Sequence, residues 1–116
     1  MQKATTLLLA GAIAIGAVSL YSPGVHAQGK KGGGDAAKGK TVFEQCSVCH
    51  DAETTDAKIG PGLKGLFKKD KLPSGKATSD ANVLKQINEG GNGMPAYKDI
   101  LSDGDKADLV AYLKTL

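Results

Sequence analysis

The most reactive part of the sequence is a pair of cysteines three residues apart, followed at once by a histidine. Cys46, Cys49 and His50 form the pattern C-x-x-C-H and include both cysteines of the chain. Two thiols at this spacing can each form a thioether with one of two neighbouring haem vinyl groups, and the imidazole of the next residue can then bind the iron. The motif therefore predicts one covalently attached haem c.

Other uses of two cysteines fit the sequence less well. A redox disulfide of the thioredoxin kind belongs to a βαβ pattern, which is absent here. A zinc site needs a fourth ligand at a suitable spacing, and a blue-copper site needs two histidines. If His26 is removed with the amino-terminal segment described below, His50 is the one histidine that remains. Haem attachment is therefore favoured over a disulfide, zinc or copper.

Counting the methionines in the same way indicates a second iron ligand. If Met1 is also removed, Met94 is the one methionine left, and it lies in the glycine-rich loop Gly90-Gly91-Asn92-Gly93-Met94-Pro95. A lone methionine is ordinarily core filling on a helix or strand face, whereas this one lies on a loop. We therefore expect Met94 to bind the iron, because Met/His ligation is the electron-transfer arrangement and raises the reduction potential. Lysine is the competing ligand type, with 14 side chains available after Lys3 is removed.

Residues 1–27 have the pattern of a secretory signal peptide. Lys3 supplies a positive charge, residues 4–21 are uncharged and rich in Leu, Ile and Ala, and Val25-His26-Ala27 predicts cleavage after Ala27. We expect a soluble protein in the periplasm or another extracytoplasmic space, without stable membrane insertion. A membrane anchor formed by residues 4–21 is the alternative, because 18 uncharged residues are at the lower limit of a span.

Cleavage would leave 116 − 27 = 89 residues, which is enough for one small domain. Residues 28–34 predict a flexible glycine-rich leader, and residues 35–116 the domain. About 35% of the 89 residues (31) are apolar, and none is tryptophan. A domain this short with few large side chains usually needs a disulfide, a metal or a cofactor, so a non-protein group is expected in its interior.

Charge is unevenly distributed along the chain. The mature sequence carries 14 lysines against 12 acids, and there is no arginine. This balance argues against a nucleic-acid-binding protein. The segment 58–76 holds six lysines and one acid, and is expected to steer an acidic redox partner. The alternative is that these lysines form only a solvated loop face.

The pattern of apolar residues predicts an all-α domain. Asp35 is a plausible N-cap for a helix reaching about Cys49, with Gly39, Phe43 and Cys46 on one face. A second helix is expected from Ser79-Asp80 to Gly90, burying Val83, Leu84 and Ile87. A third begins at Ser102, with Asp105 as its capping-box partner, and its apolar face comprises Leu109, Tyr112, Leu113 and Leu116. The long loop 51–78 contains Ile59, Leu63, Leu66, Phe67 and Leu72, so it is expected to wrap an apolar object.

Four motifs together resemble the class I monohaem cytochromes c: GDAAKGKTVFEQCSVCH, IGPGLKGLF, GGNGMPAY and ADLVAYLKTL, in this order. The resemblance covers nearly all of residues 34–116. It implies a small cytochrome c fold with crossing N- and C-terminal helices, with Cys46 and Cys49 as haem anchors and His50 and Met94 as axial ligands. It also implies that the carbonyl of Pro61 accepts the other imidazole N–H, and that Gly39, Phe43 and Tyr112 form the helix crossing. For Asn92 and Tyr97 a role near Met94 is open, and ordinary packing is the alternative.

These observations predict an electron carrier without substrate turnover, which exchanges single electrons with donor and acceptor proteins and is a monomer. An iron with both axial positions filled can change charge but has no site for a substrate. Two alternatives are a haem subunit of a larger oxidoreductase complex and, if Met94 is displaced, a haem peroxidase or sensor.

Overall fold

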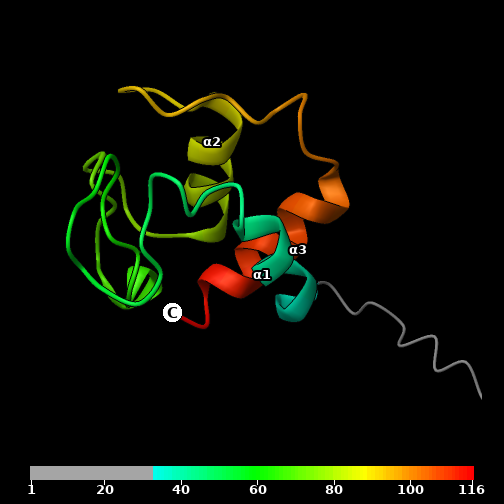
Figure 1. The fold of residues 1–116 in the computed structure, drawn as a ribbon, viewed down its shortest axis with the longest axis horizontal. Coiled ribbons are helices and arrows are strands. Elements are labelled where there is room, and N and C mark those ends of the chain that lie inside the picture. The colour runs from blue at the N-terminus through cyan, green and yellow to red at the C-terminus, as the bar shows by residue number, and fades with distance from the viewer. Residues whose placement is uncertain (1–32) are drawn as a thin grey trace, which may run out of the picture.

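The computed structural model describes residues 33–116 (Figure 1). The predicted signal peptide and residues 28–32 of the predicted leader lie outside this range. Gly34, which the sequence assigns to the leader, already contacts the carboxyl-terminal helix, because a Cβ atom on it would overlap the backbone of Ala107 and Asp108. The folded part of the chain thus includes the residue before Asp35.

The first helix, α1 (Ala36–Phe43), begins where expected but ends early. The Asp35 carboxylate accepts hydrogen bonds from the backbone N–H groups of Ala37 and Lys38, at 2.9 and 3.2 Å. The expectation of a helix to Cys49 was wrong, since residues 44–49 form turns. Bonds between residues three apart, such as Cys46 N–H to Phe43 O at 2.8 Å, tighten the backbone there.

The second α-helix has the predicted boundaries, and the third begins where expected but ends at Leu113, so Leu116, expected on its apolar face, lies beyond the helix. In α2 (Asp80–Glu89), Ser79 caps the first turn and Gly90 follows the last residue. In α3 (Asp103–Leu113), Ser102 and Asp105 form the predicted capping box. Leu84 was expected to be buried with Val83 and Ile87, but it is only half-buried.

Between α1 and α2 lies a long irregular segment that contains one short 3-10 helix, η1 (Leu66–Lys68). Within residues 33–116 the backbone forms no strand, only isolated bridges of Lys71 with Ala77 and of Gly91 with Met94. None of the helices in this range is long and apolar enough to cross a membrane.

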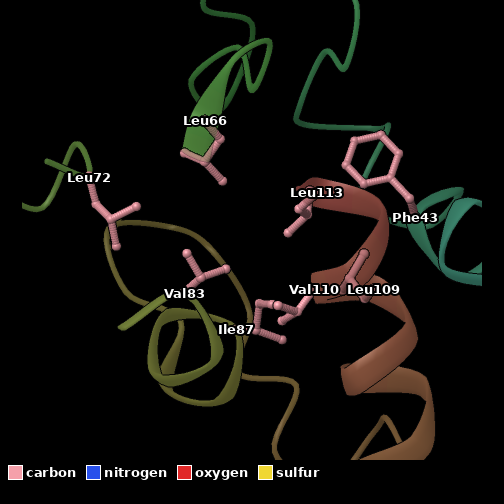
Figure 2. Close-up of a cluster of buried hydrophobic side chains, with 8 residues drawn as sticks. All are labelled: Phe43, Leu66, Leu72, Val83, Ile87, Leu109, Val110 and Leu113. Atoms are coloured by element: carbon pink, nitrogen blue, oxygen red, sulfur yellow. The ribbon is translucent and has the colours of Figure 1, made fainter. Parts of the chain in front are cut away.

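The core lies between α2, α3 and the loop that carries η1 (Figure 2), and α1 closes one side of α3. Gly39 makes the crossing of α1 and α3 possible, because a Cβ atom there would overlap the backbone carbonyl of Asp108. The rings of Phe43 and Tyr112 meet across the same crossing, with centroids 5.4 Å apart. Eight apolar side chains are buried: Phe43, Leu66, Leu72, Val83, Ile87, Leu109, Val110 and Leu113.

The long loop supplies part of this core. Leu66 and Leu72 are buried, and Leu63 and Phe67 pack against them. Ile59, the first large apolar residue of this loop, is 80% exposed to the surroundings of the polypeptide. The all-α architecture with crossing terminal helices is thus confirmed, with a core that is small for its chain length.

Candidate haem site

The cysteine pair lies in the tight turn that leaves α1. Cys46 packs against the core cluster, both thiols are partly buried, and the two sulfurs are not joined in a disulfide. Burial, followed by the proximity of Cys49, raises the pKa of the Cys46 thiol. A thiol that resists ionisation is a poorer ligand for a metal such as zinc, which binds the thiolate. Within residues 33–116 no group of three His, Cys, Asp or Glu side chains could hold a metal ion.

His50 is oriented by the loop that follows it. Its backbone N–H donates to the carbonyl of Cys46 at 2.9 Å, which places the imidazole directly after the turn. The ring nitrogen Nδ1 lies 2.8 Å from the carbonyl oxygen of Pro61, and because a carbonyl can only accept, Nδ1–H is the donor. This bond selects the tautomer and leaves Nε2 as the nitrogen available to a metal.

Gly60 lies flat against that imidazole. A Cβ atom at this position would come within 2.5 Å of Cε1 of His50 and 2.8 Å of Nδ1. The Gly60 N–H donates to the carbonyl of Cys49 at 2.8 Å, so the glycine is itself fixed to the cysteine turn. Sequence reasoning missed this role, although Gly60 lies within the IGPG motif that the resemblance quoted.

Lys58 ties the loop to the cysteine turn, and Asp51 stabilises the start of the loop. The Lys58 ammonium donates to the carbonyl of Ser47 at 2.9 Å. The Asp51 carboxylate accepts the backbone N–H groups of Glu53 and Thr54, at 2.7 and 3.0 Å. These bonds, that of Glu53 most, lower the pKa of Asp51. No sequence signal distinguished Lys58 from its neighbours, because its partner is a backbone oxygen eleven residues away.

Met94 lies in a tight turn whose backbone is left-handed at four successive residues, 90–93, with φ values from 52° to 112°. Gly91 and Met94 exchange backbone hydrogen bonds of 2.9 and 3.0 Å around Asn92 and Gly93, and Asn-Gly is the preferred pair for such a turn. Gly90 is required for a second reason, because a Cβ atom there would overlap the carbonyl of Met94. Asn92 contributes its left-handed backbone to this turn, and Met94 itself is partly buried.

The segment that carries Met94 comes close to the cysteine pair through Tyr97. Burial, and then the two cysteines, raise the pKa of this tyrosine, and both Tyr97 and Cys46 pack against the core cluster. Its backbone N–H donates to the carbonyl of Ile87 at 2.9 Å, which fixes the segment to the end of α2. Tyr97 is thus a packed residue that joins the two halves of the site.

These residues fit a covalently bound haem. Two partly buried thiols, an oriented imidazole and a glycine that makes room for the ring follow one another along the chain. Apolar side chains that are only half-buried, including Leu63, Phe67 and Leu101, face the same cluster. One hollow in the described part of the chain lies between α2, α3 and Gly33–Gly34, and its lining does not include the cysteine turn or Met94.

Fold and site together define a class: small all-α domains built around a covalently attached haem. The family model for cytochrome c matches residues 36–116. The chain belongs to the cytochrome c family.

Known proteins show the same relationship. The chain is 36% identical to cytochrome c6 of Synechocystis over 80 residues, which are 68% of this chain and 63% of that protein. It is 37% identical to cytochrome c2 of Blastochloris viridis over 97 residues, covering 69% of this chain and 76% of that one. The match therefore spans a little under two thirds of the first relative's length.

Two solved structures share the fold. The cytochrome c6 of the diatom Phaeodactylum tricornutum superposes with a TM-score of 0.57 at 28% identity, covering 71% of this chain and 93% of the other. Cytochrome cH of Methylobacterium extorquens superposes with a TM-score of 0.51 at 28% identity, and the match covers 72% of this chain and 100% of the other. Membership confirms the predicted family, fold class and single haem c with its iron.

Proposed function

We propose that this protein is an exported cytochrome c that carries single electrons through a haem bound by Cys46 and Cys49 and ligated by His50 and Met94. The observation that carries the proposal is the 2.8 Å contact between His50 Nδ1 and the carbonyl of Pro61. It orients an imidazole directly after two attachment thiols and raises the basicity of Nε2. Haem iron supplies the one-electron couple; the chain binds, orients and encloses it.

Met94 is proposed as the second axial ligand because its loop is rigidly held. Four left-handed backbone residues and two hydrogen bonds define the turn before it. Such a backbone restricts where the thioether can point, as expected for a side chain held toward a fixed site. With His50 and Met94 both engaged, no axial position is left for oxygen, peroxide or a substrate, which supports electron transfer over turnover.

An exposed lysine patch is the proposed docking surface for redox partners. Its members are all exposed and lie in the long loop that follows the haem-binding turn: Lys64, Lys68, Lys69, Lys71 and Lys76. Lys58 belongs to the same sequence segment but is engaged with Ser47. A local excess of positive charge raises the encounter rate with an acidic donor or acceptor protein.

Export and processing complete the proposal. Cleavage after Ala27 would release a soluble periplasmic protein in which a short leader from Gln28 precedes the cytochrome domain, acting as a monomer. The pattern of a charged start, an apolar stretch and a small-x-small site supports export. Retention through residues 4–21 remains the alternative to test.

The test combines the optical spectrum and the intact mass of purified, exported protein. We expect a mass equal to the chain from Gln28 plus one haem, and a far-red band in the oxidised form that reports the iron–thioether bond. Met94→His should abolish that band, keep a six-coordinate spectrum and lower the reduction potential. High-spin wild-type haem would favour a peroxidase or sensor, and constant co-purification with other subunits would favour a complex component.

A further inference from the structure

Two charged side chains are buried in residues 33–116, and both project from α3. Lys106 is 6% exposed and Asp108 is 5% exposed. Buried charges are costly unless each is hydrogen-bonded, so the partners of these two residues show what the burial accomplishes. Neither residue stands out in the sequence, where both lie among the acidic and basic residues of a surface-type helix.

Asp108 binds the segment that leads to His50. Its Oδ1 accepts the backbone N–H of Asp35 at 2.7 Å, directly before α1. The carbonyl of the same residue lies against Gly39, within α1. Because α1 runs straight into the turn of Cys46 and Cys49, Asp108 holds the proximal side of the haem site to α3.

Lys106 binds the segment that leads from Met94. Its ammonium donates to the carbonyl of Lys98 at 2.7 Å, four residues after the methionine. Its other charged contact, to Asp103 at 3.7 Å, is with a fully exposed carboxylate and is therefore weak. The neighbouring backbone bond from Lys98 N–H to Asn88 O is long at 3.3 Å, so Lys106 provides the shortest polar bond to residue 98.

We propose that Lys106 is a positioning residue for Met94, and that α3 is the common support that sets the two axial ligands relative to each other. The proposal rests on the proposed Met94 ligation. A hydrogen bond from a charged donor in a buried setting is stronger than one between neutral groups. Without the hydrogen bond from Lys106, the Met94 segment is no longer held to α3. The attachment of this segment to α2, through Tyr97 and Ile87, remains.

The experiment compares Lys106→Met with Lys114→Met in the haem-loaded protein. Lys114 is a matched control because it lies on the same helix and ties α3 to α2 through an ion pair with Asp80, not to the Met94 segment. Imidazole is the probe, since it can bind the iron only where Met94 has detached. Global stability is measured in parallel by denaturant unfolding.

We expect Lys106→Met to tighten imidazole binding about tenfold or more and to lose the far-red band at a denaturant concentration below that of unfolding. Lys106→Arg, which keeps a charged donor, should restore most of the wild-type behaviour. Lys114→Met should lose the band together with the fold. If Lys106→Met does not fold with haem, Lys106→Gln is used in the same comparison.

Equal imidazole affinity in the Lys106 and Lys114 variants would overturn the role of Lys106. Amide hydrogen exchange gives a second readout: the N–H groups of Ile100 and Leu101 should exchange faster in the Lys106 variant alone. A wild-type protein without the far-red band would instead overturn Met94 ligation, so the two failures are distinguishable.

Discussion

The imidazole of His50 rests on the backbone of Gly60, so that a Cβ atom on this glycine would lie 2.5 Å from Cε1 of the ring. The next residue, Pro61, accepts the ring N–H. One short stretch of chain therefore both supports the ring face and fixes its rotation, which is what a metal-binding histidine requires.

Gly60→Ala should displace the imidazole and weaken its bond to Pro61. We expect a loss of about 1–3 kcal/mol in the unfolding free energy, typical of overpacking, together with a changed reduction potential. Denaturant unfolding and redox titration of the haem-loaded protein measure both. Pro61→Ala is the matched control, because it keeps the carbonyl that His50 binds. A Gly60→Ala protein no different from this control would contradict the role of the glycine.

Gly39→Ala should separate α1 from α3, because the added Cβ overlaps the carbonyl of Asp108. We expect destabilisation by about 1–3 kcal/mol, read from denaturant unfolding. Gly104→Ala, within α3, is the control, and it is expected to change the unfolding free energy in the opposite direction. Its nearest neighbour would be Ser102 Oγ at 3.7 Å, so better helix propensity should stabilise the protein by up to about 1 kcal/mol. Equal effects of the two changes would show that the helix crossing does not need Gly39.

Lys69→Glu, in the exposed patch, should slow electron transfer with an acidic redox protein roughly several-fold at low salt and flatten its dependence on ionic strength. Stopped-flow rates across a salt series measure this. Lys38→Glu changes the net charge equally but lies on α1, outside the patch, so it should have a smaller effect. An equal change of rate in both variants would show that the net charge of the protein, and not the lysine patch, governs the encounter.

Tyr112→Phe should improve stability at high pH alone. Burial, and then Glu53, raise the pKa of Tyr112 above its ordinary value of 10.0. The folded state therefore favours the protonated phenol, and this contribution is complete below pH 10 and is lost as pH rises through the folded pKa. The variant keeps the ring contact with Phe43. Unfolding free energies at pH 8 and above pH 10 test this prediction. If the unfolding free energies of variant and wild type fall in parallel as pH rises, Tyr112 is not the cause of the loss of stability.

Local sequence signals predicted those features whose causes are local. The C-x-x-C-H spacing, the capping pair Ser102 and Asp105, and the end of α2 at Gly90 each depend on residues a few positions apart. The glycine-rich loop before Met94 could also be predicted, since a left-handed backbone favours Gly and Asn. The end of α1 could not be predicted from the sequence. Hydrogen bonds between residues three apart compete there with helical ones, and the spacing of apolar residues does not reveal which of them form.

The sequence alone determined the chemistry available in residues 33–116: two thiols, one imidazole and one thioether, in an order that predicts a haem. Tertiary structure alone decided how these groups are held. The contacts of Pro61 and Gly60 with His50, of Lys106 with Lys98 and of Asp108 with Asp35 all join segments through backbone atoms. Every residue carries the same backbone donor and acceptor groups, so only the folded chain selects which of them meet.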